Sequence, residues 1–172
     1  LAIADMDVFE VSNLNRQVFA DLHTVGKGKV EATVERLAAI NPGLRPVTFG
    51  PEWTGRLDEI LTEYKVVVNG MDDLAAGIHL YRKAREHGAT VIDAYTSPLP
   101  SVTLVRPQDP RPEERLGFPT LGKRWDALSA ADADAEVAPL PRPMHRLSAR
   151  RLLRSVSGCA FTATLTMTWP SS

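Results

Sequence analysis

Residues 5 to 17, DMDVFEVSNLNRQ, gather polar side chains directly behind a short apolar run. Asp5 ends that run, and Asn13 and Arg16 stand three residues apart, so they can share one face of a helical turn. Lys29 follows thirteen residues after Arg16. A carboxylate at the end of a strand can accept hydrogen bonds from ribose hydroxyls, and cations neutralise phosphate oxygens. The segment therefore indicates a nucleotide site.

A second candidate group follows the apolar run VVVNG at residues 66 to 70. Asp72 lies just beyond it and could hold Mg²⁺, which prefers carboxylate and phosphate oxygens. Each of these residues also has a plainer interpretation. Arg16 and Lys29 could be solvated surface charges, and Asp72 or Asp73 could cap the helix that follows.

The elements that would position these residues alternate along the chain. Apolar runs predict strands, and i, i+4, i+7, i+8 spacing predicts helices. The predicted strands cover residues 1–5, 44–50, 65–70, 90–95 and 101–107, and the predicted helices cover 26–40, 54–64 and 74–88. This order is typical of an α/β protein with a mainly parallel sheet. Asp5, Asn69 and Asp93 end strands, so we expect them at one edge of the sheet, where ligands of such sheets bind.

Composition excludes several classes of protein. The 172 residues carry a formal net charge of −1, which gives no overall attraction to nucleic acid or to anionic membranes. No apolar run reaches the roughly 18 residues that a membrane span needs, and no signal peptide is recognisable. Cys159 is the single cysteine and excludes an internal disulfide, so a cytoplasmic location is predicted.

Charge divides the chain unevenly. All 21 acidic residues precede residue 137, whereas residues 137–172 contain five arginines and no acid. We therefore expect three parts, namely a nucleotide-binding domain at 1–107, an irregular extension at 108–136 and a basic tail at 137–172. The tail is interpreted either as a disordered segment or as non-native sequence, such as a frame-shifted translation.

Four motifs in a fixed order carry a resemblance to a known family: DMDVFEVSNLNRQ, VGKGKVE, INP and VVVNGMDD. Together they resemble the ThiF/MoeB/HesA family, relatives of the ubiquitin-activating enzymes, over roughly residues 1 to 107. The resemblance implies a Rossmann-like sheet flanked by helices. It also implies a role for each candidate residue: Asp5 holds the ATP ribose, Asn13, Arg16 and Lys29 contact the phosphates, and Asp72 acts on the Mg²⁺–ATP side.

The activity implied by this resemblance is ATP-dependent adenylation. The substrate would be the C-terminal carboxylate of a small ubiquitin-like carrier protein or peptide, and the implied catalytic residues are Arg16, Lys29 and Asp72. ATP and Mg²⁺ are the implied cofactors. The full-length form is expected to be a homodimer that binds neither nucleic acid nor membrane.

The chain departs from the family pattern in three respects. The first strand and the glycine-rich loop, expected about 20 residues before Asp5, are missing from this sequence. The C-x-x-C pairs of many relatives are missing too, so we expect no structural zinc. Cys159 is not expected to be an acyl-accepting cysteine. Without a central first strand, the chain is expected to be marginally stable or to oligomerise.

Two other functions were weighed against adenylation. The first is a catalytically inactive remnant that acts as a carrier-protein binding module, and the absent phosphate loop favours it. The second is a nicotinamide-dependent dehydrogenase, which also uses a ribose-binding acid. Hydride transfer gives no reason for Arg16, Lys29 and Asp72 to gather near phosphates, so the dehydrogenase is disfavoured.

Overall fold

A computed structural model describes residues 1–95, 101–115, 117–129, 132 and 164–166. The strands are β1 (Ala2–Ala4), β2 (Val47–Phe49), β3 (Val66–Asn69), β4 (Thr90–Tyr95), β5 (Ser101–Val105) and β6 (Thr164–Thr166). The α-helices are α1 (Lys29–Ile40), α2 (Leu57–Glu63), α3 (Leu74–Glu86) and α4 (Pro112–Arg115). Short 3₁₀ helices η1 (Val11–Asn13), η2 (Pro51–Arg56) and η3 (Trp125–Ala127) complete the described elements.

These strands form two three-stranded sheets, ordered β2-β1-β6 and β3-β4-β5. β1 runs parallel to β2, and β3 runs parallel to β4, as expected from the strand–helix–strand order. β6 and β5 are antiparallel to β1 and β4 respectively. The prediction of an α/β fold with parallel strands is confirmed, but the described sheets are mixed rather than mainly parallel. The expectation of a missing first strand and loop stays a prediction.

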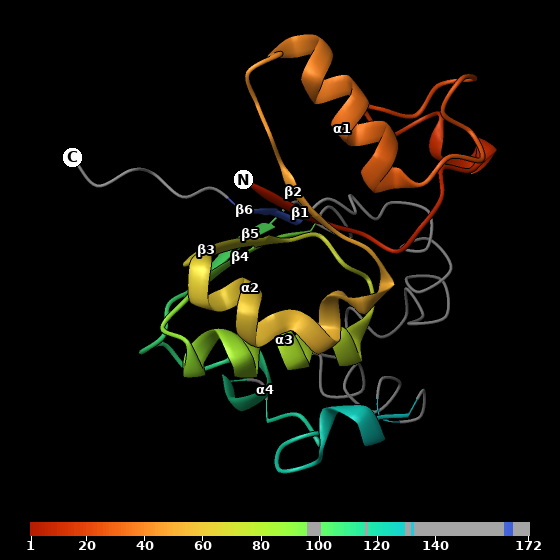
Figure 1. The fold of residues 1–172 in the computed structure, drawn as a ribbon. Helices are drawn as coiled ribbons and strands as arrows, with labels where there is room; N and C mark the ends of the chain where they lie inside the picture. The colour runs from red at the N-terminus through yellow and green to blue at the C-terminus, as the bar shows by residue number, and fades with distance from the viewer. Residues whose placement is uncertain (96–100, 116, 130–131, 133–163, 167–172) are drawn as a thin grey trace.

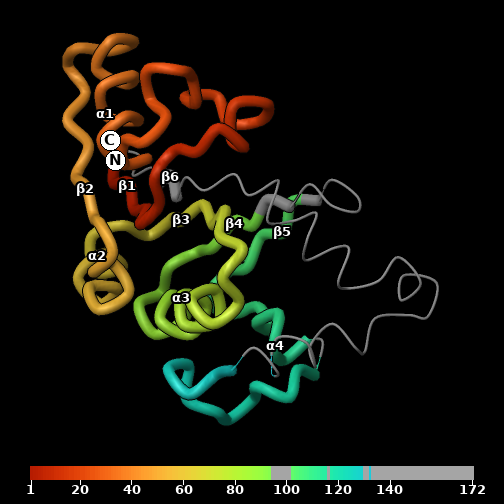
Figure 2. Tube along the Cα trace, turned by 90° about the vertical axis from the view of Figure 1, so that its right-hand side faces the viewer, coloured from red at the N-terminus to blue at the C-terminus, as the bar shows by residue number. Residues whose placement is uncertain are grey.

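The helices lie on different sides of the strands. Figure 1 shows α2 and α3 side by side on one side of the strands, whereas α1 stands apart on the other. The turned view in Figure 2 likewise places α1 away from the α2–α3 layer. No helix in the described part of the chain is long and apolar enough to cross a membrane.

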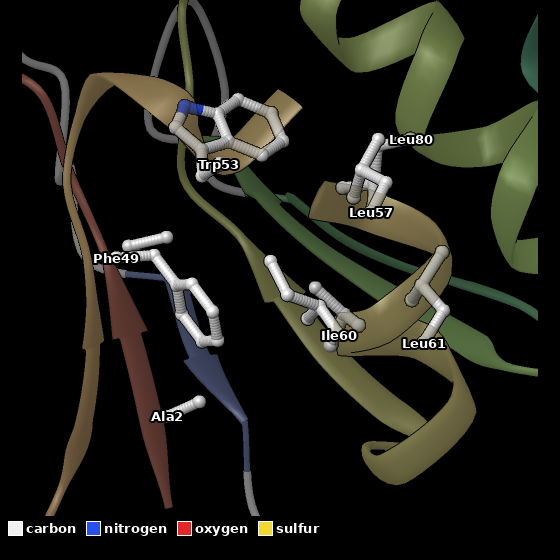
Figure 3. Close-up of a pocket in the computed structure, with 9 residues that line it drawn as sticks. Ala2, Phe49, Trp53, Leu57, Ile60, Leu61 and Leu80 are labelled. Carbon is white, nitrogen blue, oxygen red and sulfur yellow. The ribbon is translucent and has the colours of Figure 1, made fainter. Parts of the chain in front are cut away.

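The main core lies between the strands and the α2–α3 layer. Leu61 and Leu80 are 0% and 1% exposed, and Val67 and Val91 contribute from β3 and β4. Ala2 and Phe49 belong to the same cluster, so the core joins both sheets. An apolar gap of about 20 Å³ lies among these side chains. Figure 3 shows Phe49, Ile60 and Leu61 among the residues around it. A gap with such walls belongs to the core and is no polar binding site.

Two helices differ from their prediction. The predicted apolar face of α1 included Val30, Val34 and Leu37, but all three are only half-buried, because α1 does not pack on the strands. The helix predicted from Thr54 begins only at Leu57, after the turns of η2, and no side chain caps it. Its inward residues are nevertheless as predicted, since Leu57, Ile60 and Leu61 are buried.

The segment after β5 docks onto α3 although its sequence shows no periodic pattern. Arg82 of α3 donates to both carboxylate oxygens of Glu113, at 2.9 and 2.7 Å, and Glu113 is 2% exposed. Arg82 also donates to the carbonyl oxygen of Thr120. Trp125 stacks on His79 with ring centroids 4.1 Å apart. Within the predicted extension at 108–136, the described residues 108–115 and 117–129 include contacts that join it to α3.

Replacing Leu61 with alanine should strongly destabilise the chain. The side chain is fully buried against α3, so truncation removes apolar contacts and leaves a cavity. We expect the free energy of unfolding to fall by about 2–5 kcal/mol, measured by urea denaturation. Leu22→Ala is the matched control, because Leu22 is 81% exposed and should change stability by less than about 0.5 kcal/mol. Equal losses in both variants would contradict this packing.

Candidate functional site

The loop between β1 and α1 folds back on itself and carries most of the predicted site residues. Phe9 closes it: its amide donates to the carbonyl oxygen of Lys27, and its carbonyl oxygen accepts from Gly26, at 2.9 and 2.8 Å. Gly26 has a φ of +85°, a conformation that glycine adopts without strain. Gly28 then precedes the first residue of α1. The motif VGKGK is therefore the turn that delivers Lys29 to the site.

Lys29 contacts Asp7 of the DMD segment, and Asp7 in turn contacts Asp5. The Nζ atom of Lys29 lies 2.8 Å from Oδ2 of Asp7, and its backbone amide donates to the Asp7 carbonyl oxygen at 2.9 Å. The Asp7 amide in turn donates to Oδ1 of Asp5 at 2.9 Å. These bonds fix the first residue of α1 against the end of β1.

The position of Lys29 is electrostatically unusual. A cation at the first residue of a helix faces the positive end of the helix dipole, which is unfavourable. Lys29 is also only 6% exposed, so its ammonium group loses most of its hydration. A cation kept in such a place needs acidic partners, and Asp7 provides one. This ion pair keeps a positive charge at the end of β1.

Burial raises the pKa of Asp5 to about 6, and the amide of Asp7 and the charge of Lys29 oppose the rise. One oxygen of Asp5, Oδ2, is buried and lacks a hydrogen-bond partner in the part of the chain that the structure describes. A buried carboxylate oxygen without a donor is costly unless a ligand supplies one. The hydroxyls of a ribose are donors of the right kind.

Asn13 and Arg16 lie together on the turn that begins with η1. Oδ1 of Asn13 accepts from the amide of Glu10 at 2.9 Å, and its carbonyl oxygen accepts from the amide of Arg16 at 3.1 Å. One guanidinium nitrogen of Arg16 donates to the carbonyl oxygen of Ser12. Nε of Arg16 is buried without an acceptor among the described residues, which leaves it for an anionic oxygen.

A cleft of about 570 Å³ opens between the end of β1 and the first turns of α1. Asp5, Asp7 and Lys29 line it, with Val30 and Val34 forming part of its α1 wall. This volume lies within the roughly 300–1,000 Å³ of small-molecule sites. The half-exposed apolar face of α1 is therefore a wall of this cleft rather than part of the core.

Asp72 lies elsewhere, in the loop that joins β3 to α3. It is exposed, and no described contact joins it to Asp5 or Lys29. Asp73, not Asp72, caps α3, because its carboxylate accepts from the amide of Ala76 at 3.1 Å. The described residues contain no group of three or more histidine, cysteine or acidic side chains that could hold a metal ion. Any Mg²⁺ bound through Asp72 would depend on oxygens from a ligand.

Two acidic residues have interactions that the sequence did not predict. Asp7 was given no role, although the spacing D-x-D was its signal, and it is the partner of Lys29. Asp93 was expected at the edge but was given no task. Burial raises the pKa of Asp93 to about 6, opposed by a hydrogen bond from the Asn69 side chain. Asp93 was expected to end its strand, but β4 continues to Tyr95, so the acid lies within the strand.

Comparison with known proteins gives a consistent result. Residues 1–163 match the model of the ThiF family. A tRNA threonylcarbamoyladenosine dehydratase from Bacillus subtilis (strain 168) is 28% identical over 96 residues, covering 55% of this chain and 38% of the relative. A sulfur carrier protein adenylyltransferase from Thermus thermophilus is 36% identical over 74 residues, covering 42% of this chain and 27% of the relative.

The fold has a counterpart among solved structures. A crystal structure of PaaA in its selenomethionine form superimposes with a TM-score of 0.53 at 20% identity, covering 92% of this chain and 57% of PaaA. The chain spans less than two fifths of the length of the two curated relatives described. Because the family match extends over nearly the whole sequence, the predicted resemblance is confirmed, and the chain belongs to the ThiF family.

Proposed function

We propose that this chain is part of an ATP-dependent adenylyltransferase that activates the C-terminal carboxylate of a small ubiquitin-like carrier protein or peptide. The observation that carries the proposal is the pairing of a buried Lys29 with the acids at the end of β1, inside a cleft of a ThiF-family chain. The Thermus relative, named as a sulfur carrier protein adenylyltransferase, supports the same activity class.

Each candidate residue has a task in this proposal. Oδ2 of Asp5, which has no hydrogen-bond partner among the described residues, accepts hydrogen bonds from the ribose hydroxyls. Lys29 contacts the phosphates next to the ribose. Arg16 and Asn13 do not line the cleft; Arg16 is proposed to reach the phosphates as a second cation from the turn that Asn13 orders. Two fixed cations would offset the negative charge that builds up on phosphate oxygens during transfer.

The reaction joins the carboxylate to AMP. A carboxylate oxygen of the carrier attacks the α-phosphorus, the bond from that phosphorus to the bridging oxygen breaks, and pyrophosphate leaves. The product is an acyl-adenylate. Mg²⁺ is proposed to reach the phosphates from the Asp72 side, because a single carboxylate together with phosphate oxygens is a usual Mg²⁺ environment.

Lys29→Ala should weaken MgATP binding by the 172-residue chain at least about tenfold, because a charge-assisted contact to phosphate is lost. Isothermal titration calorimetry measures this directly. Lys27→Ala is the matched control, because Lys27 is exposed and pairs with Glu35 on the surface. Equal affinities in the two variants would contradict the assigned role of Lys29.

Catalysis is tested by ATP–pyrophosphate exchange in the intact protein, with a sulfur carrier protein as the probe substrate. We expect exchange that depends on the carrier and is strongly reduced by Arg16→Ala. Carrier binding without any exchange would favour the inactive binding module instead. MgATP turnover with no response to the carrier would overturn the assigned substrate class.

Nucleotide binding should release a proton near pH 6. Unbound Asp5 has a pKa of about 6, so it is partly protonated there. Ribose hydroxyls donate to the ionised form, so binding lowers this pKa and affinity for MgATP rises as the pH increases from 5 to 7.5. Calorimetry in two buffers of different ionisation enthalpy measures the released proton. Asp5→Asn removes the Asp5 contribution, and an unchanged proton release in this variant would disprove the assignment.

A further inference from the structure

Asn69 at the carboxyl end of β3 and Asp93, two residues before the end of β4, form a buried polar pair outside the cleft. Asn69 and Asp93 are register partners across the parallel ladder, and each is 3% exposed. Asn69 is the last residue of β3 and immediately precedes the loop of residues 70–73. That loop carries Asp72 and ends at Asp73, the cap of α3.

The side chain of Asn69 interacts with both the Met71 amide and Asp93. Its Oδ1 accepts from the backbone amide of Met71 at 3.2 Å, which closes the first turn of the loop. Asp93 is the register partner of Asn69 on β4, and the interaction with the Asn69 side chain lowers the pKa of the Asp93 carboxyl. An ionised carboxylate only accepts hydrogen bonds, so it forces the NH₂ end of Asn69 toward itself and the oxygen toward Met71.

Burial of the Asp93 carboxyl group costs free energy that a role in packing alone would not explain. Its side chain is buried beside Asn69, and Oδ1 has no hydrogen-bond partner within the described residues. No basic side chain contributes to its pKa, which burial raises to about 6. A buried acid with an incomplete set of partners is expected where function requires it rather than where packing alone does.

We propose that Asp93 is a positioning residue that acts through Asn69 to fix the loop carrying Asp72. With the amide of Asn69 held by Asp93, the Met71 turn is closed and Asp72 is presented at one place beyond β3. The consequence for Mg²⁺ rests on the proposed function, whereas the ordering of the loop does not.

Amide hydrogen exchange followed by NMR tests the ordering of the loop. In the 172-residue chain, Asp93→Ala should speed exchange of the Met71 amide by about tenfold or more relative to neighbouring core amides, because one end of Asn69 is released. Asn69→Ala should do the same. Asp93→Asn keeps an acceptor for Asn69 and should restore most of the protection.

Val91→Ala is the control for general destabilisation. Val91 is fully buried on the same strand, two residues before Asp93, and it belongs to the apolar core cluster, with Val67 as its register partner. It should lower the melting temperature without a selective effect at Met71. Unchanged Met71 exchange in Asp93→Ala, or an equal effect in Val91→Ala, would overturn the proposal.

A second measurement links the loop to Mg²⁺. ATP binding is followed while Mg²⁺ is titrated, and the Mg²⁺ concentration at half-maximal binding should rise severalfold in Asp93→Ala but not in Val91→Ala. An identical Mg²⁺ midpoint in both variants would remove the link to Asp72. If the unmodified chain binds no MgATP, the proposed function loses its support, and the Met71 result still decides whether Asp93 orders the loop.

Discussion

The contact of Lys29 with Asp7 is the constraint on which the candidate site depends. It places a cation at the unfavourable end of a helix and removes it from water, so the acids at the end of β1 must stay nearby. The same contact holds α1, which packs little on the strands, against the loop that carries Asn13 and Arg16. Further along α1, Arg36 forms an ion pair with Asp21 of the same loop.

The two parts of the molecule near this site differ in rigidity. β3, β4, α2 and α3 share a continuous core, and the loop after β3 is fixed at both ends by Asn69 and Asp73. The described β1–α1 part is held by hydrogen bonds and by the ion pairs of Lys29 with Asp7, Arg36 with Asp21 and Lys27 with Glu35. Binding of a phosphorylated ligand would therefore order the β1–α1 part more than the part formed by β3, β4, α2 and α3.

The sequence predicts the alternation of strands and helices better than it predicts how they pack. Asp5 and Asn69 were expected at one edge of a single sheet, but Asp5 follows β1 and Asn69 ends β3, and these strands belong to different sheets. The burial of α1 could not be predicted, because periodicity shows an apolar face but not whether that face meets a core or a cleft. The docking of residues 109–127 was invisible for another reason: Arg82 and Glu113 are 31 positions apart, and no local pattern records their pairing.

The two sheets are not joined by a backbone ladder in the described strands. β6 pairs with β1, β3 pairs with β4, and the connection between the halves is made by apolar side chains such as Phe49 and Ile60. Apolar contacts have no preferred direction, whereas hydrogen-bonded ladders fix register. The halves can therefore shift by small amounts without breaking a backbone bond. Such a joint lets the β1–β2 half, which contains the whole lining of the cleft, move as a unit against the β3–β4 half.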